Sequence, residues 1–345
     1  MLLDEKFMRR GIELALLGQG NVAPNPMVGA VIVYNDKIIG EGYHQQFGGP
    51  HAEVNAINSV EEKSLLPKST IYVTLEPCSH YGKTPPCVDL IIKNNFKRVV
   101  IGSRDPYSEV NGNGIERLKQ NEIDITLNCL EEECRNLNKH FFKFHEQKRP
   151  FIFLKWAQTC NGKIDNGSHN QIITWISSPE SKTLVHQWRK EYQAILIGKN
   201  TVENDNPNLT VRAVKGKNPI RIILDSNASL KLDYNVFNNE AKTYVFNLIK
   251  DETINNVEFI LLKNMSIETI IKKLTELEIN SVIVEGGAQI LQSFIDGDLW
   301  DEVAVLEGKT TFNEGTNAPI LNKKSNYSFE YFGDKISIYS KNEKI

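Results

Sequence analysis

The sequence Gly48-Gly49-Pro50-His51-Ala52-Glu53, together with Pro77-Cys78-Ser79-His80-Tyr81-Gly82-Lys83-Thr84-Pro85-Pro86-Cys87, decides how the first half of the chain folds. The glycine and proline residues before His51 predict a turn, and the apolar spacing over residues 52–60 predicts a helix. His51 and Glu53 therefore fall in the first turn of that helix, where the helix dipole favours a carboxylate. Residues 71–75 predict a strand that ends before Cys78, and Cys87 begins a second helical pattern.

These residue types indicate a catalytic metal site. One imidazole and two thiols give Zn²⁺ three protein ligands, His51, Cys78 and Cys87, and leave the fourth position open for water. Two thiolates and a neutral imidazole cancel the charge of the ion, which can still lower the pKa of bound water to near ~7. Glu53 follows His51 by two residues, as in the zinc nucleobase deaminases, where this glutamate is a general acid and base and not a ligand. The pattern predicts attack of hydroxide on an amino-bearing ring carbon, with Glu53 as the catalytic residue that carries protons to ammonia.

Other readings of the same residues stay open at this point. A closed structural zinc site usually has a C-x₂₋₄-C spacing, whereas eight residues separate the two thiols here. His80 is a possible fourth ligand that would close the site, but Glu53 would then have no water to activate. A lone histidine or cysteine is more often a hydrogen-bonded side chain or a small buried one. The three ligand types in this order favour the catalytic site.

Length and composition restrict the class of protein. The chain has 345 residues, which exceeds one typical core and predicts two domains. Hydrophobic residues make up 40% and charged residues 24%, and the formal net charge is −3, so the basic surface of a nucleic-acid-binding protein is not expected. Five cysteines, without an apolar run after Met1, argue against a secreted disulfide framework, and no run approaches the ~18 apolar residues of a membrane span. We expect a cytoplasmic protein that acts on a small molecule, with neither nucleic acid nor membrane as partner.

Helical and strand patterns alternate through both halves. In the first half, helices are predicted at residues 4–17, 52–60, 115–120 and 131–144, and strands at 28–34, 38–43, 71–75, 98–102 and 123–127, which indicates a mixed sheet covered by helices on both faces. The short polar segment 147–150 predicts the join, so the expected domains are residues 1–147 and 150–345. In the second half, apolar strands at 151–157, 194–198, 220–224, 243–246 and 281–285 alternate with helices at 178–192, 267–277 and 288–295. This alternation indicates a largely parallel sheet buried on both sides.

The first half resembles a known family in several motifs: Asn25-Pro26-Met27-Val28-Gly29, His51-Ala52-Glu53, the long spacer from Cys78 to Cys87, Asp105-Pro106 and Gly112-Asn113-Gly114. It is similar to the deaminase half of the bacterial bifunctional riboflavin-biosynthesis enzymes, diaminohydroxyphosphoribosylaminopyrimidine deaminase joined to 5-amino-6-(5-phosphoribosylamino)uracil reductase. Transfer-RNA adenosine and cytidine deaminases resemble the zinc site but have a two-residue spacer. The resemblance implies a cytidine-deaminase-like mixed-sheet domain, with a substrate pocket lined by Asn25, His44, Lys83 and Asp105. Tyr107 and Ser108 stand where Asn and Pro are expected, which is a departure from the family pattern.

The second half carries no motif that by itself identifies a reaction. Glu285-Gly286-Gly287-Ala288 lies between a strand and a helix, and is either a phosphate cradle or a tight turn. Together with Lys155-Trp156-Ala157, Thr174-Trp175-Ile176-Ser177, the segment 201–207 and Leu209-Thr210-Val211-Arg212, it resembles the reductase half of the same family. That resemblance implies a dihydrofolate-reductase-like α/β domain that uses NADPH. It implies cofactor contacts from Ala157, Ile176, Thr201, Asp205 and Gly287, and substrate contacts from Thr174, Arg189, Leu209, Arg212 and Glu285.

The resemblance implies two consecutive reactions. The first is zinc-hydroxide hydrolytic deamination of 2,5-diamino-6-(5-phosphoribosylamino)pyrimidin-4(3H)-one with one zinc ion per chain, and the second is NADPH-dependent reduction of the ribosyl side chain to ribityl. Arg189 and Arg212 suit the phosphate because guanidinium groups bind it bidentately. Two other hypotheses are a nucleic-acid-editing deaminase, disfavoured by charge and by the long spacer, and a zinc-stabilised scaffold, disfavoured by Glu53. The sequence leaves open whether the protein forms a homo-oligomer.

Overall fold

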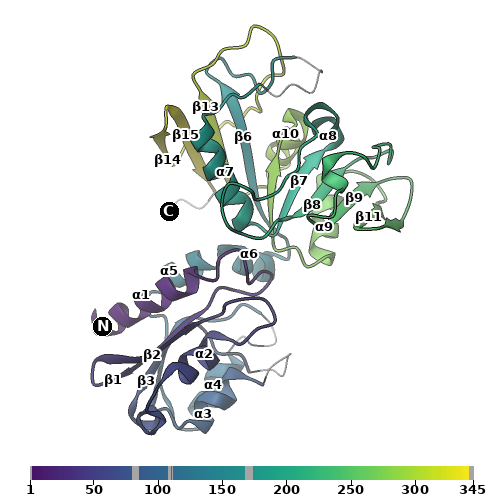
Figure 1. The fold of residues 1–345 in the computed structure, drawn as a ribbon. Coiled ribbons are helices and arrows are strands. Elements are labelled where there is room, and N and C mark those ends of the chain that lie inside the picture. The colour runs from purple at the N-terminus through teal and green to yellow at the C-terminus, as the bar shows by residue number, and fades with distance from the viewer. Residues whose placement is uncertain (1, 80–84, 108–109, 111, 168–173, 342–345) are drawn as a thin grey trace. The chain divides into compact units, whose positions relative to one another are not determined.

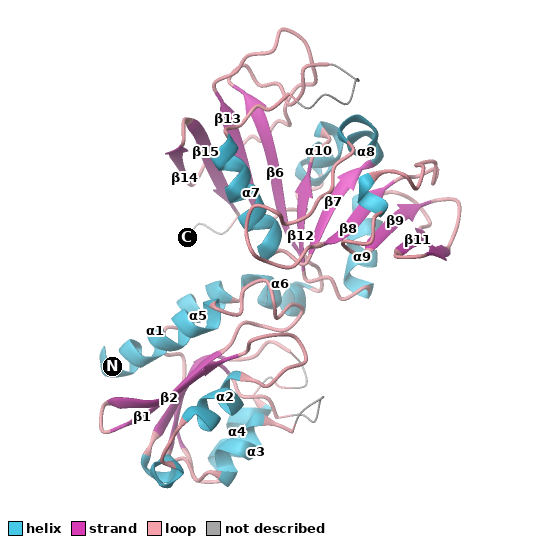
Figure 2. Ribbon diagram, viewed as in Figure 1, coloured by secondary structure: helices cyan, strands magenta, loops and turns pink. Residues whose placement is uncertain are grey.

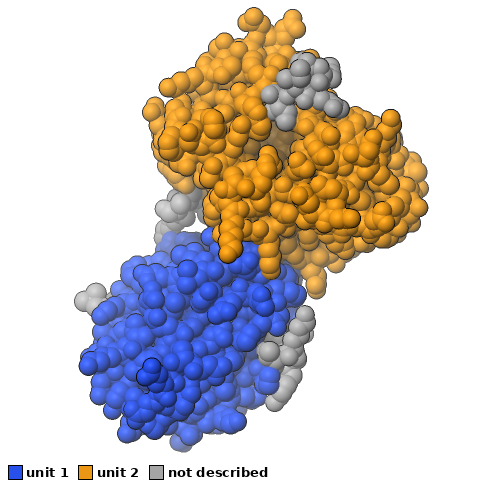
Figure 3. Space-filling model, in the orientation of Figure 1, with its two compact units in different colours: residues 1–148 blue, residues 149–345 orange. Residues whose placement is uncertain are grey.

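The computed structural model describes residues 2–79, 85–107, 110, 112–167 and 174–341 (Figure 1). The chain divides into two compact units, residues 1–148 (unit 1) and residues 149–345 (unit 2), which Figure 3 shows in blue and orange. Among the helices of the described chain, none combines the length and the apolar character that a membrane span requires.

Unit 1 is a mixed five-stranded sheet with helices on both faces (Figure 2). The strand order is β2-β1-β3-β4-β5, in which β1 is antiparallel to both neighbours and β3, β4 and β5 are parallel. Helices α2, α3 and α4 cover one face, while α1 and α5 cover the other. The elements are α1 (Leu2–Leu16), β1 (Gly29–Tyr34), β2 (Lys37–Tyr43), α2 (Ala52–Ser59), the 3₁₀ helix η1 (Lys63–Lys68), β3 (Thr70–Leu75), α3 (Cys87–Lys93), β4 (Arg98–Ser103), α4 (Asn113–Gln120), β5 (Asp124–Thr126), α5 (Glu131–Leu137) and α6 (Lys139–Gln147).

Strand periodicity explains why both faces of this sheet are covered. Along β1, Ala30 and Ile32 pack into the core beneath α2 and α3, whereas Val31 and Val33 pack against α1. All four side chains are buried. Because successive strand residues point to opposite faces, a strand that is apolar throughout needs helices on both sides.

One predicted helix is wrong. The pattern over residues 131–144 predicts a single helix, but the structure has α5 and α6, separated at Asn138. The buried Asn138 side chain accepts the backbone N–H of Met27 (2.7 Å) and donates to the Met27 carbonyl (2.8 Å). Its backbone leaves helical geometry at φ −114°, ψ 29°. The helix therefore breaks because the Asn138 side chain bonds to Met27, a residue distant in the sequence that lies on the same segment as Asn25.

Unit 2 is built on a ten-stranded sheet in the order β10-β11-β9-β8-β7-β12-β6-β13-β15-β14. The strands from β11 to β13 in that order are parallel, and antiparallel strands complete both edges. The elements are β6 (Phe151–Thr159), α7 (Pro179–Glu191), β7 (Ala194–Gly198), α8 (Lys199–Asp205), β8 (Ile220–Leu224), the 3₁₀ helix η2 (Asn235–Phe237), β9 (Thr243–Asn247), β10 (Glu252–Ile254), β11 (Val257–Leu261), α9 (Ile267–Glu276), β12 (Ser281–Glu285), α10 (Ala288–Asp296), β13 (Glu302–Gly308), β14 (Tyr327–Tyr331) and β15 (Asp334–Ser340).

The parallel strands of unit 2 are buried on both faces, as their apolar runs predict. Ile152 and Leu154 of β6 belong to one core, and Phe151 and Phe153 belong to the core on the other face. The chain leaves β7 toward β8 but leaves β12 toward β13, in opposite directions along the sheet. Such a reversal opens a crevice outside the carboxyl ends of the strands, where ligands bind in α/β sheets. Glu285 is the last residue of β12, and Thr201 and Gly287 follow the carboxyl ends of β7 and β12 within three residues.

Candidate active sites

The three predicted metal ligands lie at the ends of regular elements of unit 1. His51 is the N-cap residue of α2, Cys78 follows β3, and Cys87 is the first residue of α3. Their ligand atoms lie within 4.8 Å of one another, with Nδ1 of His51 3.5 Å from Sγ of Cys78 and 3.3 Å from Sγ of Cys87. Tetrahedral zinc, with bonds of ~2.0 Å to nitrogen and ~2.3 Å to sulfur, separates such atoms by about 3.5 Å. The donor set therefore fits a zinc ion. His80 lies outside the described residues.

The surroundings of Cys78 favour metal binding. The backbone N–H of Cys87 donates to Sγ of Cys78 at 3.3 Å. Hydrogen bonding to the Cys87 thiol, and then to His51, lowers the pKa of Cys78. A lowered pKa favours the thiolate, which is the form that binds metals.

Glu53 is buried in the first turn of α2, beside this donor set. Its carboxyl group contacts the Cys87 thiol. Burial, reinforced by the negative charge of Cys78, raises the pKa of Glu53 to about 6. A carboxyl group that titrates near neutral pH can take and return a proton within one catalytic cycle.

Asn25 and His44 lie next to the metal ligands. The His44 ring packs edge-on against the His51 ring, with centroids 5.5 Å apart. Nδ1 of His44 lies 3.0 Å from the Pro50 carbonyl, which can only accept, so this nitrogen carries the proton and Nε2 accepts from the Asn25 amide at 3.3 Å. Burial lowers the pKa of His44, which agrees with a neutral ring. His44 thus orients Asn25. Lys83 lies outside the described residues.

Asp105 reaches the site on the segment after β4. Burial, with smaller effects from Glu76 and Cys78, raises the pKa of Asp105 to about 7. Sequence reasoning missed Glu76, a buried carboxylate that accepts backbone N–H groups from Asp105 (3.4 Å), Gly112 (3.1 Å), Gly114 (3.1 Å) and Ile115 (3.2 Å). A charged residue directly after an apolar strand, and directly before Pro77-Cys78, is the signal that marks it. Tyr107, which departs from the family pattern, donates its backbone N–H to Asp105 at 2.8 Å, and its ring packs on that of His145. These two contacts hold Tyr107 in place.

In unit 2, the structure brings Thr201 and Gly287 together. Gly286 and Gly287 have φ of +78° and +72°, in the left-handed region that favours glycine. A Cβ at Gly286 would lie 3.1 Å from the Thr201 side chain, and one at Gly287 would lie 3.6 Å from the Thr201 hydroxyl. The turn before α10 therefore approaches α8 closely, with free N–H groups at the beginning of a helix.

The other predicted cofactor residues lie along β13 and α8. Ala157 pairs with Leu306 in the β6–β13 ladder, and a Cβ at Gly308 would lie 2.1 Å from the carbonyl oxygen of Ile176. Ala157 and Ile176 thus both lie against β13. Asp205 is the last residue of α8 and is exposed.

A buried ion cluster holds Glu285 at the end of β12. Arg189 on α7 donates two 2.8 Å hydrogen bonds to its carboxylate, and Nζ of Lys155 lies 3.7 Å away. The side chains of Arg189, Lys155 and Glu285 are only 13%, 13% and 8% exposed. Burial opposes ionisation of Glu285, but the charges of Arg189 and Lys155 outweigh it and lower its pKa to about 2. The guanidinium group of Arg189 thus binds Glu285. Of the two arginines suggested for the substrate phosphate, Arg212 is the exposed one.

His186, which sequence reasoning missed, links this cluster to the predicted substrate residues. Its Nδ1 accepts the backbone N–H of Arg212 at 3.4 Å, and its ring also bonds to the backbone of Thr210, next to Leu209. The spacing of His186 and Arg189, three positions apart on α7, is the signal that places them on one helix face. Thr174 is exposed and its hydroxyl accepts from Asn166 at 2.9 Å.

We expect His186 to make the stability of unit 2 depend on pH. Burial, together with the charges of Arg189 and Arg212, lowers the pKa of His186 from 6.5 to about 4. The unfolded chain therefore takes up the proton first, so the stabilising contribution is complete above pH 6.5 and is lost as the pH falls toward 4, by roughly 2 to 3 kcal/mol. Glu285 adds no pH dependence above pH 5, because it is ionised in both states there.

Urea unfolding of the full chain between pH 7 and pH 5 measures this effect. Tryptophan fluorescence reports on unit 2 alone, because the four tryptophans all lie there: Trp156, Trp175, Trp188 and Trp300. His186→Asn keeps an acceptor for the Arg212 N–H and should flatten the pH dependence. Equal losses of stability in the variant and the wild type would assign the effect to other groups.

Family models match both halves of the chain. The model described as the RibD C-terminal domain matches residues 150–308, and the cytidine and deoxycytidylate deaminase zinc-binding region matches residues 1–103. These matches confirm the fold class, a cytidine-deaminase-like domain followed by a reductase domain.

Whole-chain relatives agree with the two domain matches. The riboflavin biosynthesis protein RibD of Aquifex aeolicus is 41% identical over 330 residues, which cover 94% of this chain and 92% of that protein. RibD of Escherichia coli is 35% identical over 321 residues, covering 88% of this chain and 86% of that protein.

Solved structures give the same result. A Thermotoga maritima protein described as a diaminohydroxyphosphoribosylaminopyrimidine deaminase/5-amino-6-(5-phosphoribosylamino)uracil reductase has a TM-score of 0.88 and 40% identity, covering 97% of this chain and 98% of that chain. Acinetobacter baumannii RibD has a TM-score of 0.87 and 28% identity, covering 98% of both chains. The resemblance predicted from the motifs is confirmed, and the chain belongs to the RibD family of bifunctional deaminases and reductases of riboflavin biosynthesis.

Proposed function

We propose that unit 1 deaminates 2,5-diamino-6-(5-phosphoribosylamino)pyrimidin-4(3H)-one, and that unit 2 uses NADPH to reduce the ribosyl side chain of the product to ribityl. The observation that carries this proposal is the buried carboxyl group of Glu53 beside three ligand atoms for one zinc ion. The two activities in the description of the Thermotoga maritima protein support the choice of substrate and the order of the steps.

The metal ligands and Glu53 account for the hydrolytic step. His51, Cys78 and Cys87 would hold one zinc ion per chain, and zinc when bound lowers the pKa of a coordinated water to near ~7. Glu53 takes a proton from the attacking water and passes it to the departing ammonia. Its buried place in the first turn of α2 keeps its carboxyl group beside the ligand set during both transfers.

Two further residues would hold the pyrimidine. The Asn25 amide, fixed by its contact with the neutral His44 ring, can both donate and accept along the edge of the base. Asp105, with a pKa raised to about 7, is protonated in a large fraction of molecules at neutral pH and can donate to a ring nitrogen or carbonyl. Both side chains approach the metal ligands from loops outside the sheet, so they hold the ring against the reacting centre.

Unit 2 would supply the contacts for reduction. NADPH provides the hydride, and the protein provides orientation. The turn at Gly287, packed on Thr201, offers backbone N–H groups to the cofactor phosphates. Glu285 is kept ionised by its two cationic neighbours, so its carboxylate acts as an acceptor for a substrate hydroxyl. Arg212 is exposed, with its backbone N–H bonded to His186, and it suits the substrate phosphate.

A paired assay on purified, zinc-loaded protein tests the proposal. Ammonia release is followed with the phosphoribosylated diaminopyrimidinone in the absence of NADPH, and NADPH oxidation is followed after deaminated product has formed. Both signals, with about one zinc ion per chain, are the expected result. Ammonia without NADPH oxidation would overturn the cofactor or substrate assigned to unit 2, and zinc binding without ammonia would overturn the substrate assigned to unit 1.

A further inference from the structure

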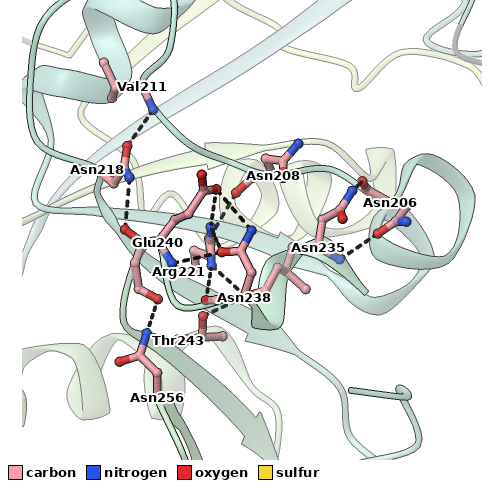
Figure 4. A network of polar contacts seen from close by, with 12 residues as sticks. Asn206, Asn208, Val211, Asn218, Arg221, Asn235, Asn238, Glu240, Thr243 and Asn256 are labelled. Atoms are coloured by element: carbon pink, nitrogen blue, oxygen red, sulfur yellow. Dashed lines mark hydrogen bonds and ion pairs between the residues drawn. The ribbon is translucent and has the colours of Figure 1, made fainter. Parts of the chain in front are cut away.

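Arg221 of β8 is a fully buried cation that bonds to loops instead of to a buried acid (Figure 4). Its Nε donates to the carbonyl oxygen of Asn208 (3.0 Å), Nη1 donates to those of Val236 (3.0 Å) and Asn238 (3.1 Å), and Nη2 donates to Oδ1 of Asn238 (2.9 Å). The carboxylate of Glu240 lies 3.9 Å away and is 58% exposed. An apolar side chain would fill the sheet interior without the cost of desolvating a charge. What the guanidinium adds is a fixed position for the segments whose carbonyl groups it binds.

One of these segments is the loop 206–212, which carries the proposed substrate residues Leu209 and Arg212. Leu209 is buried in the left-handed region at φ +55°, so the loop has a defined and unusual backbone shape. The Asn208 carbonyl that Arg221 holds directly precedes it.

Two asparagines hold the same loop on either side of that point. Asn235 donates its backbone N–H to Oδ1 of Asn206 and its amide to the Asn206 carbonyl, both at 2.8 Å. Asn218 accepts the backbone N–H of Val211 at 2.9 Å and donates to the Glu240 carbonyl at 3.0 Å. Figure 4 shows the three anchors, Asn235, Arg221 and Asn218, in one continuous polar network along the loop.

We infer that Arg221, Asn218 and Asn235 are positioning residues of the reductase site, which hold the loop 206–212 so that Leu209 and Arg212 meet the substrate. The inference rests on the proposed function, because it takes the substrate contacts of that loop as given. Each of the three side chains bonds to the backbone of this one loop, and Arg221 and Asn218 also bond to the segment 236–240.

The test is steady-state reduction of separately supplied deaminated product by the full-length, zinc-loaded chain. Asn218→Ala and Asn235→Ala should raise the KM for this substrate about tenfold with a smaller effect on kcat, because the loop loses one anchor while the hydride-transfer centre is retained. Arg221→Lys keeps the charge but cannot reach three carbonyls, and should raise KM further. Arg221→Lys changes a fully buried residue and is the variant most at risk of misfolding. The test therefore rests on Asn218→Ala and Asn235→Ala, which change half-buried residues.

Asn256→Ala is the matched control. Asn256 is also half-buried and donates its amide to a backbone carbonyl, that of Ala241, at 2.5 Å, but it does not hold the loop. It should lower the unfolding temperature about as much as Asn218→Ala and leave KM unchanged. Equal KM values for Asn218→Ala, Asn235→Ala and the wild type would overturn the positioning role, and so would the same KM increase in Asn256→Ala.

Arg212→Ala separates this inference from the proposed function. If it raises KM while the asparagine variants do not, the substrate contact stands and the positioning role fails. If Arg212→Ala and Leu209→Ala both leave KM unchanged, the proposed substrate role of the loop fails, and the inference fails with it. An increase in KM in all the loop and anchor variants, without one in Asn256→Ala, supports both.

Discussion

The Glu53→Gln variant should lose ammonia release by ~10²- to 10⁴-fold while it keeps its zinc and its reductase activity. Glutamine has nearly the same shape as glutamate, so it fills the buried position beside Cys87 without a cavity. It cannot take a proton from water or return one to the leaving amine, and only that function is removed. Ammonia release, zinc content and NADPH oxidation with supplied deaminated product, all measured on one preparation, give the result.

The bifunctional chain provides the control for this experiment. Cys87→Ser should lower zinc content and ammonia release together, whereas Glu53→Gln should lower ammonia release alone, which separates a ligand from a general base. Normal NADPH oxidation in both variants shows that unit 2 is folded. Ammonia release by Glu53→Gln within about tenfold of the wild type would contradict the assigned role.

The metal site could be predicted from sequence because each of its parts is local. The turn before His51 and the strand before Cys78 set where each side chain lies, and the structure brings the ligand atoms of the three predicted residues together. The break at Asn138 could not be predicted in this way. Helical periodicity continues through residues 131–144, and the competing interaction is with Met27, which is distant in the sequence.

The ion cluster of unit 2 was hidden from sequence for the same reason. Lys155 and Glu285 are direct partners in the parallel β6–β12 ladder, although some 130 residues separate them. Each appears in the sequence as a single charge at the end of an apolar run. Family resemblance named Glu285 and Arg189 separately as substrate residues, but only their side-chain contacts in the structure show that they bind each other. Strands β10, β11, β13, β14 and β15 were missed as well. The edge strand β14 carries no burial pattern, because four of its five residues are exposed.

Glu285→Gln should lower the free energy of unfolding of unit 2 by about 3–5 kcal/mol, because it leaves the buried charges of Arg189 and Lys155 without a carboxylate. Urea unfolding at pH 7, followed by tryptophan fluorescence, measures the loss. The folded pKa of Glu285, about 2, lies below its ordinary value of 4.5. The contribution of its charge is therefore complete above pH 4.5 and is lost as the pH falls toward 2, so pH 7 records it in full.

The double variant Arg189→Met with Glu285→Gln identifies the cause of that loss. If an unpaired charge is responsible, removing one cation together with the carboxylate should be less destabilising than the sum of the two single changes. Reductase activity should be lost in all three variants, whereas zinc content and ammonia release should stay normal, because the metal ligands and Glu53 all lie in unit 1. Strictly additive effects would show that water or counterions neutralise the cluster in solution, and Glu285 would then act on the substrate alone.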